Sequence, residues 1–412
     1  MQKFRVTSVF CLFHITNRWL TEKITCSMNS KAKLGISAAI LIGVIVSSNT
    51  GFDWSVLSGQ ISNTIQSNDG GSDLQSDTLN IGYFPNVNLA QAIIGIGTGN
   101  ISKSITESIE DRNFTINARA FNSGPSMVDA LYSGRIDVAY IGPNNIIDGF
   151  ILSGADGLRI ISGVSSGGTS FVVRNESGIE SVNDLGGKKF ATPQLGNTQD
   201  VALRKYLVDS GYNTIDNGGN VTIVALKPGD IISQFQNKEI DGAWVPEPIT
   251  TILEQQSNAK ILVDERDLWP DGKFVTGNII VRTDYLRDNP DVIKRLLEAH
   301  VDETLWINEK LLKTDDNSPD ENKVSTLVMA FNNGLKNLTG KTFPDNQLSE
   351  ALSRIEFTND PLSDSLLKIT DLTYQFGFIK KGSGWNDEFQ ELYDLTLLNE
   401  VLSEKGLQAI NK

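Results

Sequence analysis

The chain has 412 residues, more than one ordinary domain holds, and 39% of them are hydrophobic, as in soluble globular proteins. Its 50 acidic side chains outnumber its 36 basic ones and give a formal net charge of −14, which argues against nucleic acid as a partner. The only cysteines are Cys11 and Cys26, so the rest of the chain offers no disulfide and no cysteine metal site.

The N-terminal segment, residues 1–52, has the pattern of an export signal or a membrane anchor. Two lysines precede residues 34–46, which carry no charge, and the next charged residue is Asp53. A basic flank before a short apolar run is typical of a secretory signal, and the whole uncharged run approaches the ~20 residues that span a bilayer. A cleaved signal and an uncleaved anchor both fit, and translation could start at Met1 or Met28. In either case we expect the bulk of the chain on the extracytoplasmic face of the membrane.

Residues 53–78 are rich in Ser, Asn, Gly, Gln and Asp and poor in apolar side chains. Such a composition cannot bury enough apolar surface to order itself, so it predicts a flexible linker. No cysteine follows the apolar run, which gives no support for a lipid anchor.

Residues 79–168 predict a first α/β lobe. The runs 79–83 and 136–141 are short, mostly apolar and bounded by turn residues, as buried parallel strands are. Gly-Pro pairs at 124–125 and 142–143 open helices, because proline at the first helical position loses no needed N–H. Two helix N-termini would then face one edge of a sheet, which suits an anionic or polar ligand.

The same design recurs further along the chain. Ile136-Asp-Val-Ala-Tyr-Ile-Gly-Pro143 has an echo in Ile240-Asp-Gly-Ala-Trp-Val-Pro246. The upstream strands pair in the same order: residues 79–83 with 189–192, and 114–118 with 221–225. An internal repeat of this kind predicts two similar lobes, the second covering residues 169–272.

The lobes need a connection, and residues 163–168 are small and flexible enough to form a hinge crossing. A strand at 274–284 then returns toward the first lobe, so residues 273–412 are expected to rejoin it and add C-terminal helices. His300 falls in a predicted helix at 291–306, as a surface or partly buried residue, and no histidine-based catalytic or metal site is expected.

A polar loop at residues 194–200 opens a helix that runs through Val208. Asn197 or Thr198 suits its N-cap. An ordinary capped helix and a donor-rich loop aimed at a ligand are both consistent with this pattern.

From residue 79 to about 377 the chain resembles the substrate-binding proteins of ABC importers for aliphatic sulfonates, taurine, nitrate and bicarbonate. The motifs that carry the resemblance are Gly82-Tyr-Phe-Pro-Asn86, Phe121-Asn-Ser-Gly-Pro125, Tyr140-Ile-Gly-Pro-Asn144, residues 163–168, Ala191-Thr-Pro-Gln-Leu-Gly-Asn-Thr-Gln-Asp200, Asp241-Gly-Ala-Trp-Val-Pro-Glu-Pro248, Val263-Asp-Glu-Arg-Asp-Leu-Trp-Pro270 and Phe357-Thr-Asn-Asp-Pro-Leu362. The resemblance implies an α/β, two-lobed fold of the type II periplasmic-binding-protein class, with a hinge between the lobes. It also implies a small-molecule ligand, ABC permease and ATPase partners, no cofactor and no metal.

Strand-end loops and the resemblance together nominate twelve ligand-binding residues. They are Pro85, Asn86, Ser123, Gly124, Asn144 and Asn145 in the first lobe, Ser166 and Gly167 at the hinge, and Asn197, Thr198, Trp244 and Glu247 in the second lobe. Backbone N–H groups at the helix starts would hold an oxyanion.

Two of these residues have a second interpretation. Trp244 either walls the cleft or is a core aromatic. Glu247 either faces the cleft, where it would suit a ligand with an amine, or simply occupies a favourable first helical turn.

Two other functions share this fold class. An enzyme similar to the thiamine-pyrimidine synthases would need His and Cys, and the chain beyond the N-terminal segment offers one His and no Cys. A membrane-anchored ligand sensor without a transporter has the same sequence features as a transport receptor. We therefore expect a non-enzymatic receptor for a small anion, with sulfonates or taurine as the leading candidates.

Overall fold

The computed structural model describes residues 78–108, 114–152, 156–313, 320–380 and 389–411. The predicted signal or anchor and nearly all of the linker lie outside these ranges. Within them, no helix combines the length and the apolar character needed to cross a bilayer.

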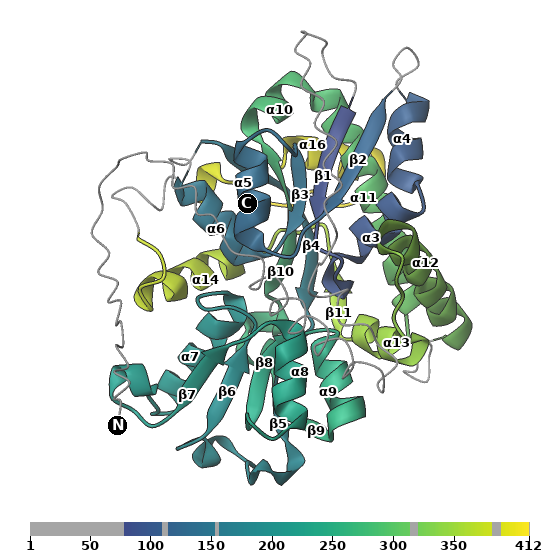
Figure 1. Ribbon diagram of the computed structural model, residues 1–412. Helices are drawn as coiled ribbons and strands as arrows, with labels where there is room; N and C mark the ends of the chain where they lie inside the picture. The colour runs from purple at the N-terminus through teal and green to yellow at the C-terminus, as the bar shows by residue number, and fades with distance from the viewer. Residues whose placement is uncertain (1–77, 109–113, 153–155, 314–319, 381–388, 412) are drawn as a thin grey trace, which may run out of the picture. The chain divides into compact units, whose positions relative to one another are not determined.

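Two mixed sheets organise the described residues (Figure 1). The six-stranded first sheet has the order β11-β4-β10-β3-β1-β2, and the five-stranded second sheet has the order β7-β6-β8-β5-β9. The strands of the first sheet are β1 (Thr78–Tyr83), β2 (Thr115–Ala120), β3 (Val138–Ile141), β4 (Leu158–Gly167), β10 (Val275–Arg282) and β11 (Ile355–Phe357). Those of the second are β5 (Thr169–Arg174), β6 (Lys189–Thr192), β7 (Thr222–Ala225), β8 (Gly242–Pro246) and β9 (Ala259–Asp264). We refer to each sheet with its helices as lobe 1 and lobe 2.

Helices cover both sheets (Figure 1). In lobe 1 they are α3 (Ala90–Gly97), α4 (Asn100–Ser108), α5 (Gly124–Tyr132), α6 (Pro143–Leu152), α10 (Thr283–Asp288), α11 (Pro290–Leu311), α12 (Glu321–Thr339), α13 (Asp345–Ser353), α14 (Ser363–Gln375) and α16 (Thr396–Glu404). In lobe 2 they are α7 (Thr198–Asp209), α8 (Pro228–Gln236) and α9 (Ile249–Ser257). The C-terminal helices also reach the second lobe, since α13 contacts α9 and α14 contacts α7.

In both sheets an antiparallel strand is inserted next to the parallel ones. β10 lies between β3 and β4 and pairs antiparallel with both, and β5 holds the matching place between β8 and β9. Only Gly168 separates β4 from β5, so the chain enters lobe 2 directly from the sheet of lobe 1. It returns through residues 265–274 between β9 and β10.

The hydrophobic core follows this division. One large cluster fills lobe 1 on both faces of its sheet, whereas two smaller clusters lie on opposite faces of the second sheet. Side chains alternate between the faces of a strand, so Ala243 and Val245 of β8 pack with α8 and α9, and Trp244 packs with α7. Lobe 2 is therefore covered by helices on both faces.

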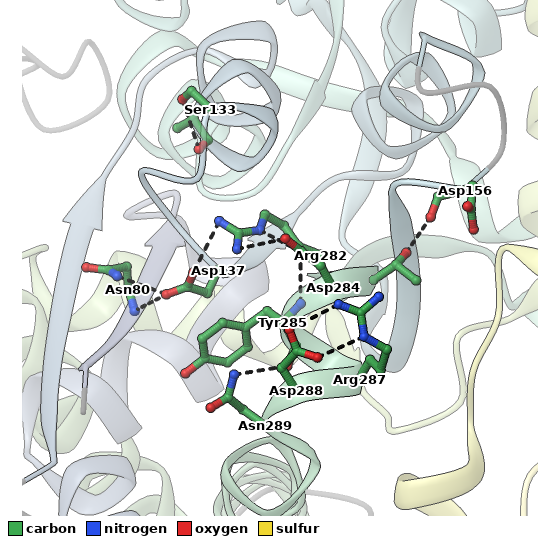
Figure 2. Close-up of polar contacts among 12 residues, drawn as sticks. Asn80, Ser133, Asp137, Asp156, Arg282, Asp284, Tyr285, Arg287, Asp288 and Asn289 are labelled. Carbon is green, nitrogen blue, oxygen red and sulfur yellow. Dashed lines mark hydrogen bonds and ion pairs between the residues drawn. The ribbon is translucent and has the colours of Figure 1, made fainter. Parts of the chain in front are cut away.

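The first copy of the sequence repeat is built around a buried carboxylate (Figure 2). Asp137, just before β3, is 4% exposed and accepts hydrogen bonds from the backbone N–H and the side-chain amide of Asn80, each at 2.9 Å. Arg282, at the end of β10, places its Nη1 3.4 Å from the other carboxylate oxygen. Asp137 thus ties three neighbouring strands together at the end of the sheet where β1 and β3 begin.

The second copy repeats this arrangement with different side chains. Asp241 accepts from the backbone N–H of Lys189 at 3.0 Å and pairs with Arg174 of β5 at 3.1 Å. Arg174 therefore plays the part in lobe 2 that Arg282 plays in lobe 1. The repeat predicted from the sequence is confirmed in strand pairing, since β1 joins β2 and β3 in parallel as β6 joins β7 and β8.

His300 departs from expectation, because it is fully buried rather than at the surface. Its Nε2 lies 2.9 Å from the carbonyl oxygen of Gly163, and burial lowers its pKa to about 4. The helical spacing predicted the helix, but the direction in which His300 points was set by packing of α11 on β4.

The turn before Asp137 and the turn before Asp241 each contain a residue in the left-handed conformation, and that residue differs between the two copies. Gly134 has φ +67°, and a Cβ there would lie 2.9 Å from Arg282 Nη1. The equivalent residue in lobe 2 is Lys238, a non-glycine residue at φ +61°.

Replacing Lys238 with glycine should raise the free energy of unfolding by about 0.5–1 kcal/mol, because relief of the left-handed conformation outweighs the added flexibility of the unfolded chain. The lost pair with Glu176 is long, at 3.9 Å, and exposed, so it contributes little. Urea unfolding of the full chain measures the difference. Gly134→Ala is the matched control and should destabilise by about 1 kcal/mol or more; a neutral Gly134→Ala would contradict this account.

Candidate functional site

Helix starts from both lobes converge where the parallel strands end. In lobe 1, β1 leads into a 3-10 turn at Val87–Leu89, and β2 and β3 lead into α5 and α6. In lobe 2, β6 leads into α7 and β8 into α9. Parallel strands place their carboxyl ends at one edge of a sheet, so in each lobe these helix starts lie along that edge.

Three predicted residues come together at the start of α5. Ser123 is its N-cap residue, and its hydroxyl makes no capping hydrogen bond. Gly124 follows, and a Cβ built on it would lie only 1.8 Å from Oδ1 of Asn145 in α6. The close approach of Asn145 therefore requires glycine at this position, and it places a side-chain amide next to the start of α5.

Asn144 makes one of the contacts between the lobes. Its Nδ2 donates to the carbonyl oxygen of Gly196 at 2.8 Å, and its Oδ1 accepts from the hydroxyl of Thr198 at 3.1 Å. Asn144 is the second residue of α6 and Thr198 the first of α7, and both are buried. Two predicted site residues thus bring the positive ends of helices from opposite lobes against each other.

Asn86 and Asn197 act as caps of their own helical turns. Asn86 accepts from the N–H of Val87 at 2.7 Å, beside the half-buried Pro85. Asn197 accepts from the N–H of Asp200 at 2.9 Å. For both side chains the structure therefore shows ordinary helix capping. A ligand that contacted either amide would have to share it with the N–H group that it caps.

At the hinge, Ser166 and Gly167 lie at the end of β4. The Ser166 hydroxyl accepts from the N–H of Phe274 at 3.1 Å, which links the two crossings of the chain. Gly167 and Gly168 have φ of +77° and +70°, a conformation that favours glycine. These residues form the crossing, and all three are buried.

Trp244 lies in the core of lobe 2 rather than on the wall of a cleft. It is 0% exposed, stacks on Phe171 with ring centroids 5.3 Å apart, and donates its indole N–H to Glu265 at 2.7 Å. The alternation of side chains along β8 directs it to the face covered by α7. Of its two interpretations, the core aromatic matches this placement.

Glu247 is buried and paired with an arginine that the sequence did not nominate. Its carboxylate accepts from the Thr251 N–H at 3.1 Å, in the first turn of α9, and from Arg354 Nη1 at 2.9 Å. Burial raises its pKa, and the Arg354 guanidinium and the Thr251 N–H work against that rise. Arg354 follows α13 and also binds Glu254 at 2.6 Å and Glu350 at 2.8 Å, so it joins the C-terminal part of lobe 1 to lobe 2.

The sequence analysis also did not nominate two polar residues near the hinge, Asn88 and Thr276. Asn88 donates to the carbonyl oxygen of Thr276 at 3.0 Å, and the Thr276 hydroxyl lies 3.1 Å from that of Ser165. Among the described residues, the buried Asn88 Oδ1 and Thr169 Oγ1 have no hydrogen-bond partner. Asn88 follows Pro85 in the same turn and could have been nominated, whereas nothing in the sequence marks Thr276.

Asp200 and Arg204 form an ion pair close to the contact between Asn144 and Thr198. Asp200, in the first turn of α7, accepts from the Gly196 N–H at 2.9 Å and pairs with Arg204 at 2.9 Å. Phe378, just after α14, lies against Gly196, with the Arg204 guanidinium 5.4 Å from its ring centroid. In the described ranges no three His, Cys, Asp or Glu side chains gather into a set able to hold a metal ion.

Arg354→Gln should lower the free energy of unfolding by about 2 kcal/mol or more at pH 8, because it leaves the Glu247 carboxylate buried without its cation. The loss should be smaller at pH 5: the pKa of Glu247 is already raised, rises further without Arg354, and the protonated carboxyl is cheaper to bury. Denaturant unfolding at the two pH values tests this.

Glu350→Gln removes the exposed partner of Arg354 and is the matched control, with an expected loss within about 0.5 kcal/mol. Equal losses from Arg354→Gln and Glu350→Gln would show that the buried pair is unimportant.

Comparison with known proteins gives relatives that are similar to this chain in sequence. The chain is 31% identical over 218 residues to a Brucella abortus protein named as a binding protein, covering 50% of this chain and 65% of that one. It is 26% identical over 303 residues to a Bacillus subtilis protein named for binding aliphatic sulfonates, covering 72% and 82%, and 29% identical over 188 residues to the taurine-binding periplasmic protein of Escherichia coli, covering 46% and 56%.

Solved structures show the same fold at lower identity. The periplasmic aliphatic sulphonate binding protein of Escherichia coli matches with a TM-score of 0.58 and 21% identity, over 76% of this chain and 92% of that one. The periplasmic nitrate-binding protein of Synechocystis PCC 6803 matches with 0.60 and 15%, over 80% and 89%. These likenesses confirm the predicted two-lobed periplasmic-binding-protein fold. The model of the NMT1-like family matches residues 72–317, and the chain belongs to that family.

Proposed function

We propose that this protein is an extracytoplasmic solute-binding receptor of an ABC importer, which captures a small anion between its lobes and delivers it to a permease. The observation that carries the proposal is the meeting of α6 and α7 through Asn144 and Thr198. Each helix N-terminus carries about half a positive charge, so two that face each other favour an anion between them. The relatives named for sulfonates, taurine and nitrate support the same class of ligand.

Neutral donors, rather than arginines, would hold the acidic head. Ser123 and Asn145 offer a hydroxyl and an amide at the helix starts. Asn144 and Thr198, which bond to Gly196 and to each other, would share their donors with the ligand. Arg204 and Arg354 are engaged by buried carboxylates. A cradle of this kind, enclosed between the lobes, is little screened by salt, so affinity should depend only mildly on ionic strength.

The ion pair between Glu247 and Arg354 bears on whether the ligand carries an amine at the end opposite its acidic head. Its two oxygens already accept from Thr251 and Arg354, so it is not a free partner for an ammonium group. This removes the main reason to prefer an amine-bearing ligand over a simple anion. We therefore place alkanesulfonates ahead of taurine as candidates.

The N-terminal segment completes the proposal. A signal or anchor at residues 34–52 and a linker at 53–78 would hold the binding lobes outside the membrane, next to a permease.

A thermal-shift screen of the full chain with ethanesulfonate, taurine, nitrate and bicarbonate should single out ethanesulfonate. Asn144→Ala should then weaken its binding by about 1–3 kcal/mol, through lost hydrogen bonds to a charged group. Isothermal titration measures the change.

Asn197→Ala is the comparison variant, because that side chain caps α7. It should cost about 1 kcal/mol of stability and less affinity than Asn144→Ala. Full affinity in Asn144→Ala would overturn the proposed cradle.

Binding should also close the lobes, since the described residues show two short crossings, at Gly168 and at residues 265–274, about which the lobes can hinge. A ligand that binds the closed form raises the melting temperature in step with the logarithm of its concentration above Kd. Small-angle scattering should show a smaller radius of gyration with saturating ethanesulfonate. A stabilising ligand that leaves the scattering curve unchanged would count against closure.

A further inference from the structure

A buried carboxylate stands at the start of the return crossing. Glu265 is the first residue after β9, and it is 1% exposed. Its Oε2 accepts the indole N–H of Trp244 at 2.7 Å, and its Oε1 accepts that of Trp269 at 3.4 Å. Both partners are neutral indoles, so the carboxylate is hydrogen-bonded without being paired to a cation there.

The two indoles belong to opposite sides of the crossing. Trp244 is part of the lobe 2 core, where it stacks on Phe171. Trp269 stacks on Phe274 at 5.5 Å and packs against the core of lobe 1. Lys368 of α14 lies 4.7 Å above the Trp269 ring. Glu265 therefore joins two aromatic groups that are anchored in different lobes.

Few charges face this carboxyl group. In its own loop Asp264 binds Arg266, at 3.1 Å or less, and Asp267 is exposed. From α7 comes the Tyr206 ring, 5.7 Å from that of Trp244. α14 contributes Lys368, which lies over the Trp269 ring, and the adjacent β5 presents Ser170 and Phe171, which do not titrate at neutral pH.

We propose that Glu265 couples closure of the lobes to uptake of a proton, so that ligand capture at the proposed site is tighter in mildly acidic solution. The inference rests on the proposed function, because it concerns the regulation of that site. Opening requires the crossing at residues 265–274 to change its path, which moves Trp269 relative to Trp244. The contacts of Glu265 then loosen and water reaches the carboxyl group.

The direction of the effect follows from the environment of the carboxyl group. Burial is the largest influence, and it raises the pKa of Glu265 to about 7, while the two indole N–H groups lower it and Asp264 raises it. A hydrated glutamate has a pKa near 4.3. The closed arrangement therefore binds the proton more tightly than an open one, and protonation favours closure. Affinity should be flat above about pH 8, rise as the pH falls through 7, and level off near the pKa of the open form.

The test is isothermal titration of the full chain with ethanesulfonate. Affinity should be at least about twofold and at most about tenfold higher at pH 6 than at pH 8. At pH 6.5, titrations in buffers of different ionisation enthalpy should show uptake of several tenths of a proton per ligand bound.

Glu265→Gln keeps the shape and should abolish both effects. Glu303→Gln is the matched control: Glu303 is another buried carboxyl group with a raised pKa, but it lies in α11, away from the crossing. It should leave both effects unchanged. Equal pH dependence in the wild type and Glu265→Gln would overturn the inference while leaving the proposed receptor function intact.

If none of the anions binds, the proposed function fails, and ligand-free protein still tests the inference. Scattering should show contraction of the wild type between pH 8 and pH 5.5 and none in Glu265→Gln; no contraction in the wild type would overturn it. If Glu265→Gln does not fold, Trp269→Phe replaces it. Losing one indole donor removes an influence that lowers the pKa of Glu265, so the transition should move to higher pH, and an unmoved transition would overturn the inference.

Discussion

The architecture depends on two antiparallel strands that complete the sheets. β10 pairs antiparallel with β3 and β4, β5 pairs antiparallel with β8 and β9, and each directly follows a crossing between the lobes. Because only Gly168 separates β4 from β5, the end of β4 in the first sheet lies next to the start of β5 in the second. The carboxyl ends of the parallel strands in both sheets then face the same region between the lobes. Without this short connection between the sheets, the starts of α6 and α7 would not be held in contact.

Much of this architecture could be predicted from the sequence, because the signals for it are local. Strand runs, Gly-Pro helix openings and the Ile-Asp repeat depend on side-chain periodicity and turn chemistry, which neighbouring residues determine. The repeat was the most informative signal, because Asp137 and Asp241 do the same work in the two lobes. Their partners, Arg282 and Arg174, were not predicted, since they arrive on strands that the repeat does not contain.

The candidate site was predictable as a set of loops, but not in its side-chain roles. Asn86 and Asn197 looked identical in kind to Asn144, yet the first two bond to N–H groups within their own turns and the third reaches across to Gly196. Glu247 and Trp244 were assigned to the ligand, and each has a partner distant along the chain, Arg354 or Glu265. Local patterns cannot reveal such partners, because tertiary packing chooses them.

The strand order also has a consequence for how the chain assembles. All five strands of the second sheet come from one continuous stretch, residues 169–264, so that lobe can form as soon as this stretch is available. The first sheet has a vacancy between β3 and β4 until β10 arrives, and its edge waits for β11 at residues 355–357. Pairings between distant segments form slowly because loop closure must precede them. The lobe that comes first in the sequence is thus the last to be completed, and its unpaired β4 edge is the part of the nascent protein most in need of protection from aggregation.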